Sequence, residues 1–175
     1  MPRLFPHGGG GRTGRALRMK ALRSCCAALA FAALVATAPA TQAADISILG
    51  TWQIVETAPA PWSPPAQRAT LAAAGKRQLN SLVTFAQASI SSKFKRLDCK
   101  NRVLYEPNAL EVDSLFQGNL PEPNPAAAAA RLGFPKGNIP GVDVRCIREQ
   151  FTFHFRDPNT ALINLDGVIY TLKRQ

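Results

Sequence analysis

The chain has 175 residues and a formal net charge of +10 at pH 7, from 21 basic and 11 acidic side chains. Six of the basic residues and none of the acidic ones lie in the first 43 residues, so the remaining 132 residues carry only +4. Mild basicity of this size does not indicate nucleic-acid binding. A stretch of 132 residues suffices for one domain with a single hydrophobic core.

The first 43 residues have the pattern of a secretory signal peptide. A cationic stretch begins at Met19, an apolar run covers 25–38, and small residues close the segment at Ala43. We expect translation from Met19 and cleavage between Ala43 and Ala44. The apolar run is about 14 residues long, whereas a membrane span takes roughly 20. We therefore expect a periplasmic or secreted protein with no stable membrane span after processing.

Residues 44–175 are predicted to form one domain built mainly of β-strands. Apolar and polar residues alternate in short segments separated by turn residues, as expected of half-buried strands. Proline interrupts this pattern between Ala58 and Pro65, and helix-forming residues predict two short helices. A turn is predicted at Glu106-Pro107-Asn108 and a loop at 119–125. In chain order the predicted strands are 48–56, 79–86, 89–92, 102–106 and 109–113, and the predicted helices are 67–74, stopped by Gly75, and 126–132.

The last third of the chain has the clearest strand pattern. Residues 142–148 and 151–156 alternate regularly, and two further strands flank Asp166-Gly167, a strong hairpin signal because both residues tolerate positive φ. A two-residue turn there fixes the register of strands 160–165 and 168–173. On one face it pairs Leu165 with Val168, Ile163 with Tyr170 and Ala161 with Leu172, while the other face carries Asn164, Thr171 and Lys173.

Seven or eight strands with hairpin connections, in roughly 130 residues, predict a small antiparallel β-barrel of about eight strands with one or two short helices. Cys99 and Cys146 are the two cysteines beyond residue 43, and in an oxidising compartment we expect them to form a disulfide. A metal site would need three or four ligands, and His154 is the only histidine in this part of the chain. We therefore expect no metal and no cofactor.

Gly50-Thr51-Trp52 near the start of the domain and Arg174 in the last predicted strand resemble the lipocalin-like (calycin) barrels. The resemblance implies a secreted β-barrel in which Trp52 fills the closed end. It also implies that Arg174, or Lys173, covers the indole ring in a cation–π contact. The alternative is that Trp52 is a core aromatic residue of an unrelated barrel.

No group of residues predicts catalysis. His154 shares its strand face with Thr152 and Arg156 and is expected to point to solvent, with a haem ligand at the barrel mouth as the alternative. Glu111 and Asp113 are expected on one strand face roughly 7 Å apart, a separation compatible with glycosidase chemistry, although a solvated face is the simpler interpretation. We expect a binding protein rather than an enzyme.

Two binding functions fit this architecture. In the first, the barrel interior holds a small apolar or amphipathic ligand. The candidate lining residues, which also suit a packed core, are Trp52, Phe151, Phe153, Phe155 and Tyr170. In the second, the protein is a protease-inhibitor-like or other interaction module that acts through the Pro59–Pro65 loop. Trp62 in that loop either contacts a partner or folds back to cap the barrel.

A cluster of positive charge provides a further candidate surface. Five of the six charged residues between positions 93 and 102 are basic: Lys93, Lys95, Arg96, Lys100 and Arg102. The first three are candidate partner-binding residues. We expect this cluster to form either a solvated rim or a surface that attracts an acidic envelope component, such as an anionic lipid headgroup or an acidic protein.

Overall fold

The computed structural model describes residues 46–121, 123–147 and 149–175. The predicted signal peptide, its cleavage point between Ala43 and Ala44 and the start at Met19 lie outside the described residues. Within the described part of the chain, no helix has the length and apolar character needed to cross a membrane.

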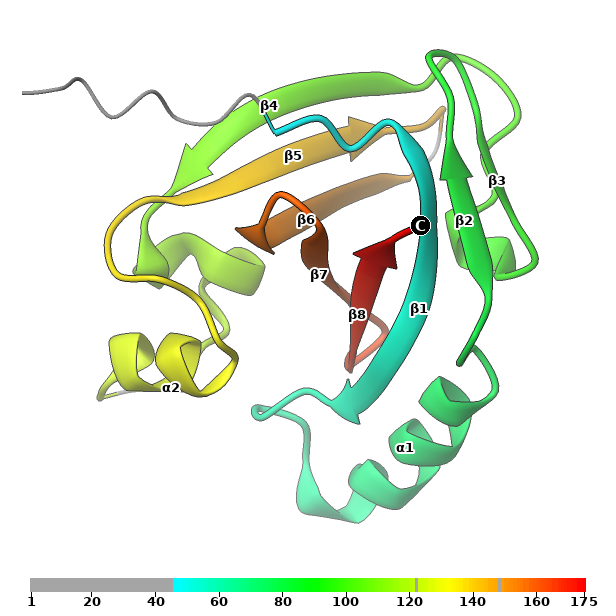
Figure 1. Ribbon diagram of the computed structural model, residues 1–175. Coiled ribbons are helices and arrows are strands. Elements are labelled where there is room, and N and C mark those ends of the chain that lie inside the picture. Colours follow the sequence, from blue (N-terminus) through cyan, green and yellow to red (C-terminus); the bar gives the residue numbers. More distant parts are fainter. Residues whose placement is uncertain (1–45, 122, 148) are drawn as a thin grey trace, which may run out of the picture. The chain divides into compact units, whose positions relative to one another are not determined.

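Eight antiparallel strands form one curled sheet, a half-barrel (Figure 1). Their order is β3-β2-β1-β8-β7-β6-β5-β4, so every pair of neighbours is consecutive in the chain except β1 and β8. The expected mainly β, antiparallel architecture of about eight strands is confirmed. The strands are β1 (Gly50–Pro59), β2 (Leu82–Phe85), β3 (Ile90–Ser92), β4 (Leu104–Leu110), β5 (Ile139–Arg145), β6 (Gln150–Asp157), β7 (Thr160–Leu165) and β8 (Val168–Arg174).

Short helices connect the strands: η1 (Pro65–Gln67), α1 (Arg68–Lys76), η2 (Lys95–Leu97), η3 (Val112–Gly118) and α2 (Pro125–Arg131). The predicted helix stop at Gly75 is wrong, because α1 continues to Lys76. Gly75 instead permits close packing of α1 on the sheet. A Cβ atom at this position would lie 2.9 Å from Thr57 Oγ1 and 3.1 Å from Val168 Cγ1.

The hairpin register predicted from Asp166-Gly167 is confirmed. Leu165 pairs with Val168, Ile163 with Tyr170, and Ala161 with Leu172. All six side chains belong to the hydrophobic core inside the curled sheet. The local turn chemistry and the apolar pattern therefore agree with the pairing.

The turn predicted at Glu106-Pro107-Asn108 is wrong, because these residues lie in the middle of strand β4. β4 is an edge strand that pairs only with β5. Proline is tolerated on an edge strand, where its missing N–H is not needed for a ladder. The two short strands expected at 102–106 and 109–113 are thus one strand, which ends at Leu110 before η3 begins.

Strands β7 and β8 contribute apolar side chains to a hydrophobic cluster on each face of the sheet. The interior cluster includes Trp52, Phe153 and Leu172. A second cluster lies on the outer face, where Leu162 and Ile169 contact residues of η3, α2 and the segment after α2. The chain between β4 and β5 therefore forms a second layer over the outside of the sheet.

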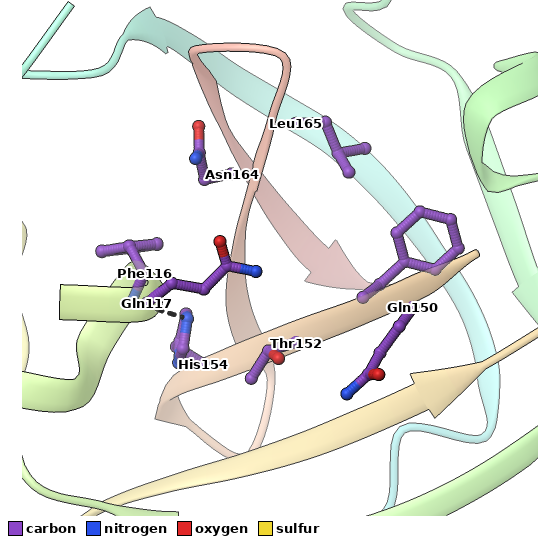
Figure 2. A pocket seen from close by; sticks show the side chains of 8 residues that line it. Phe116, Gln117, Gln150, Thr152, His154, Asn164 and Leu165 are labelled. Carbon is purple, nitrogen blue, oxygen red and sulfur yellow. Dashed lines mark hydrogen bonds between the residues drawn. The ribbon is translucent and has the colours of Figure 1, made fainter. Parts of the chain in front are cut away.

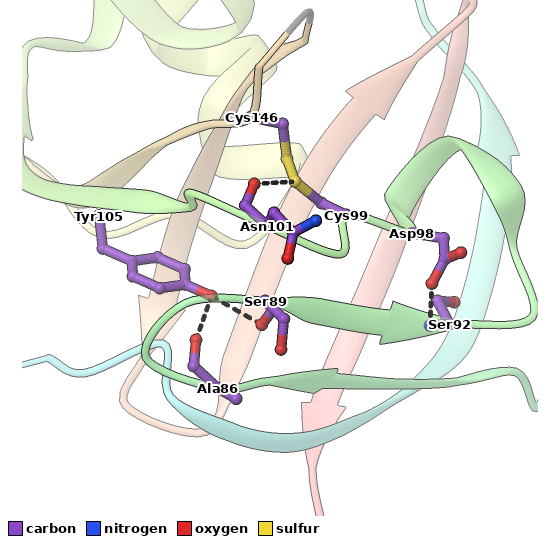
Figure 3. The surroundings of a disulfide bond; sticks show 8 residues. All are labelled: Ala86, Ser89, Ser92, Asp98, Cys99, Asn101, Tyr105 and Cys146. Atoms are coloured by element: carbon purple, nitrogen blue, oxygen red, sulfur yellow. Dashed lines mark hydrogen bonds between the residues drawn. A yellow bond between two sulfur atoms is a disulfide. The ribbon is translucent and has the colours of Figure 1, made fainter.

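The seam between edge strands β3 and β4 is closed without a continuous ladder. Ile90 forms an isolated bridge with Cys99, and the Tyr105 hydroxyl donates to the carbonyl of Ala86 at 2.8 Å (Figure 3). The predicted disulfide between Cys99 and Cys146 is confirmed, and it ties this seam to the end of β5 (Figure 3). These contacts satisfy and cover part of two exposed edges.

Replacing Cys99 and Cys146 together by alanine is predicted to lower the free energy of unfolding by about 2–4 kcal/mol, because the bridge restrains the unfolded chain. Urea denaturation of the variant and the wild type measures the difference. Lys100→Ala/Ile147→Ala, at two exposed residues next to the cysteines, keeps the bridge and is the matched control. Equal stability of all three proteins would contradict the prediction.

Candidate functional site

The five aromatic residues expected to line a ligand cavity lie in the interior core: Trp52, Phe151, Phe153, Phe155 and Tyr170. Their rings contact one another and neighbouring rings. The centroids of Trp52 and Phe155 are 6.0 Å apart, edge to face, and those of Phe94 and Tyr170 are 5.1 Å apart. All five are at most 4 % exposed. These side chains are packed as the core of the half-barrel.

The contact implied by the resemblance is present at one end of the sheet. The Arg174 guanidinium carbon lies 4.4 Å from the Trp52 ring centroid, whereas Lys173 is exposed. Arg174 also donates to the carbonyl of Leu49 at 2.7 Å and to that of Ser47. The arginine therefore holds the residues before β1 over the tryptophan.

The proline-rich segment is attached to the sheet. The Ala60 N–H and the Ser63 hydroxyl both donate to the carbonyl of Gly167, at 2.8 and 3.1 Å. Trp62 is half-buried, and its ring centroid is 5.5 Å from that of Phe116. The tryptophan thus folds back onto the protein as in the second alternative, but it packs on the outer hydrophobic layer and not as a cap on the barrel.

The candidate cation Arg96 joins three segments of the protein. Its guanidinium lies 2.9 Å from the carboxylate of Glu149, before β6, and 3.2 Å from that of Asp166, in the β7–β8 turn. Both pairs are solvent-exposed and contribute little to stability individually. Lys93 makes no ion pair with any residue that the structure describes, and it lines a surface groove.

The expectation that His154 points to solvent is wrong: the side chain is only 2 % exposed. His154 does lie on the outer face of β6, opposite the interior phenylalanines, but η3 and the segment after α2 cover that face. The imidazole centroid is 4.6 Å from that of Phe116 and 6.4 Å from that of Phe134. A second layer therefore occupies the space expected to be solvent.

The hydrogen bonding of His154 defines its protonation. The backbone N–H of Phe116 donates to Nε2 at 3.2 Å, so Nε2 is an acceptor and the neutral ring carries its proton on Nδ1. Burial lowers the pKa of His154 to about 4, and the nearby Asp143 carboxylate only partly opposes this. The imidazole is therefore neutral at pH 7.

A polar cluster lies beside His154 on the outer face of β4, β5 and β6. Asp143 accepts from the Asn108 amide at 2.8 Å and from the Thr152 hydroxyl at 2.6 Å. Gly141 stands between Asn108 and His154 in the register. A Cβ atom on Gly141 would overlap the Asn108 side-chain oxygen. Glycine therefore admits this side chain next to the histidine.

A small pocket opens on this face between β6, β7 and η3 (Figure 2). Its volume is about 50 Å³, room for a few waters or one small polar group. His154 Nδ1 and Asn164 Oδ1 are both buried and have no hydrogen-bond partner among the described residues. The lining residues are Phe116, Gln117, Gln150, Phe151, Thr152, His154, Asn164 and Leu165.

The backbone over the pocket is strained. Phe116 and Gln117 have φ values of 51° and 62°, in the left-handed region that non-glycine residues rarely adopt. Each such residue costs roughly 1–2 kcal/mol. The hydrogen bond to His154 and the packing of Trp62 hold Phe116 in place. Strain of this kind is concentrated at functional sites.

Glu111 and Asp113 do not share a strand face as expected. Glu111 precedes η3 and Asp113 lies in its first turn, because the strand ends at Leu110. In the described part of the chain, no group of three or more His, Cys, Asp or Glu side chains is placed to hold a metal ion. Comparison of the chain with protein-family models, with curated proteins and with solved structures gave no match.

Acid is predicted to destabilise the protein through His154. Its pKa is about 4 in the folded state and near 6.5 when unfolded, so only the unfolded state takes up a proton between these values. The stabilisation that comes from this difference in pKa is fully present above pH 6.5. It is lost as the pH falls to 4, which lowers the free energy of unfolding by about 3 kcal/mol. Urea denaturation at pH 7.5 and 4.5 measures it. His154→Gln, which keeps an acceptor for Phe116, is expected to lose less; an equal loss would show that other groups cause it.

Trp62→Ala is predicted to lower the free energy of unfolding by about 2 kcal/mol, because a half-buried aromatic contact with Phe116 is lost. Leu104→Ala, at a side chain that is 58 % exposed, is the matched control. Thermal or urea unfolding compares the variants. If Trp62→Ala left the unfolding midpoint unchanged, the result would instead favour a Trp62 side chain that contacts a partner.

Proposed function

We propose that this protein is an exported, non-catalytic binding module that recognises an uncharged polar group in the outer pocket. The observation that carries the proposal is that two residues lining the pocket, His154 and Asn164, each have a buried polar atom, Nδ1 and Oδ1, with no partner among the residues that the structure describes. A buried polar atom without a partner costs roughly 1–3 kcal/mol. A ligand group that pairs with these atoms recovers this energy on binding.

The lining favours an amide. Nδ1 of the neutral histidine is a donor and Oδ1 of Asn164 is an acceptor, so a group that pairs with either atom is polar, and an amide supplies both a carbonyl and an N–H. All eight lining residues are uncharged at pH 7, which disfavours a charged ligand because its desolvation would not be offset. A carboxamide or peptide group has the required chemistry and fits a pocket of this volume.

The same geometry supports binding rather than catalysis. A general base needs a free lone pair, but Nε2 of His154 already accepts from Phe116 and Nδ1 holds the proton. Both oxygens of Asp143 are likewise engaged, by Asn108 and Thr152. His154 and Asp143 are therefore each held in place by hydrogen bonds from neighbouring residues.

Export is supported by the Cys99–Cys146 disulfide, because such bonds persist in oxidising compartments. The packed interior leads us to propose a ligand outside the half-barrel rather than among the interior aromatic side chains. Of the five aromatic residues expected to line a cavity, Phe151 also lines the outer pocket. The attached proline-rich segment leads us to assign Trp62 a supporting role behind Phe116.

The proposal is tested by titrating the isotopically labelled protein with acetamide, monitored by two-dimensional amide NMR. We expect saturable shifts at Gln117, Thr152 and the Asn164 side chain, and none with acetate, which has a similar shape but a negative charge. Asn164→Leu removes the acceptor and is expected to weaken binding about tenfold. Asn101→Leu, outside the pocket, is the matched control. Shifts spread evenly over the protein, or unaffected by Asn164→Leu, would contradict the proposal.

A further inference from the structure

A second surface, away from the pocket, lies on the outer side of β2 and β3. Two adjoining hollows there, of about 420 and 350 Å³, share Leu82 and Lys93 as lining residues. We call them together the β2–β3 groove. The remaining lining residues are Leu79, Asn80, Ser81, Thr84, Ser91, Ser92 and Lys95.

The groove belongs to the strongly basic part of the chain. Residues 68–102 contain eight basic side chains and one acidic side chain, a formal charge of +7. The rest of the chain after residue 45 contains seven basic and nine acidic side chains, a formal charge of −2. Arg96 of this segment pairs with Glu149 and Asp166, two acidic residues from outside it. Counting these two with the segment leaves a formal charge of +5 around α1, β2, β3 and η2, which attracts anions.

Apolar side chains are exposed within the groove. Leu82 is 50 % exposed and Leu79 is 37 % exposed. Leu82 points outward because it alternates with the buried Val83. Lys93 has no ion-pair partner among the described residues, and the Lys95 ammonium is 3.9 Å from Asp98 while its side chain is 87 % exposed. The groove thus presents leucines beside mobile, solvated ammonium groups.

We propose that the β2–β3 groove docks the protein on an anionic phospholipid surface. A phospholipid carries a phosphate next to an apolar chain, and the groove carries lysines and hydroxyl groups next to leucines. The lysines attract the phosphates, and the exposed leucines enter the boundary between headgroups and acyl chains. An acidic protein would satisfy the charges but leave the leucines unexplained.

The test measures sedimentation of the processed protein, purified from the exported fraction, with vesicles made of equal parts phosphatidylglycerol and phosphatidylcholine. Each basic residue near such a surface raises the binding constant roughly fivefold, so Lys93→Ser/Lys95→Ser is expected to weaken binding about 25-fold. Arg131→Ser/Lys136→Ser removes the same charge at α2 and the loop after it and is the matched control, with expected binding unchanged. The processed protein lacks the apolar run 25–38, so this run does not contribute to the binding measured.

Two further measurements test whether the groove itself contacts the lipid. Leu82→Ser is expected to weaken binding even at high salt, when the electrostatic part is screened. Vesicles containing a paramagnetic lipid are expected to broaden the amide signals of 79–95 more than those of 125–136. Equal loss in the two double variants, equal binding to pure phosphatidylcholine, or Lys93- and Lys95-dependent binding of polyglutamate without binding of vesicles would overturn the proposal. The last result would identify an acidic protein as the partner.

Discussion

The outer face of β7 and β8 carries two apolar side chains that have to be buried, although Asn164, Thr171 and Lys173 share this face, and this requirement determines much of the structure. Leu162 and Ile169 lie on the outside of the sheet, yet both are buried. Because exposing such strands to water is unfavourable, the chain between β4 and β5 folds back over them as η3 and α2. The second layer brings Phe116 to His154 and thereby creates the pocket.

The remaining contacts hold the sheet on which this layer rests. Arg174 and Trp52 fix the residues before β1 at one end, while Tyr105 and the Cys99–Cys146 bridge close the seam between β3 and β4. These contacts join segments far apart in the chain. A pocket formed by η3, β6 and β7 depends on such a frame, because its small volume leaves little tolerance for movement between the elements.

Features set by neighbouring residues could be predicted from the sequence, and features set by distant segments could not. Asp166-Gly167 gave the β7–β8 register because a two-residue turn allows few alternatives. The burial of His154 could not be derived from alternation in β6, because its cover comes from residues 38 positions away. The local signal was weak: Leu162 and Ile169 are single apolar residues on a strand face that otherwise carries polar ones. The sequence around Pro107 predicted a turn in place of a strand, because only the order of the strands in the sheet shows that β4 is an edge strand, where proline is tolerated.

The pocket and the β2–β3 groove differ in electrostatics in a way that fits two separate tasks. The pocket is neutral, partly enclosed and built on strained backbone, so the binding proposed for it depends on hydrogen-bond geometry at short range. The groove is basic, open and lined by flexible lysines, so it acts at longer range and with little selectivity. The Asp143 carboxylate beside His154 raises the pKa of the ring, but burial lowers it further, to about 4, so the ring stays neutral at pH 7. Concentrating the unpaired charge on a different part of the sheet leaves the pocket uncharged.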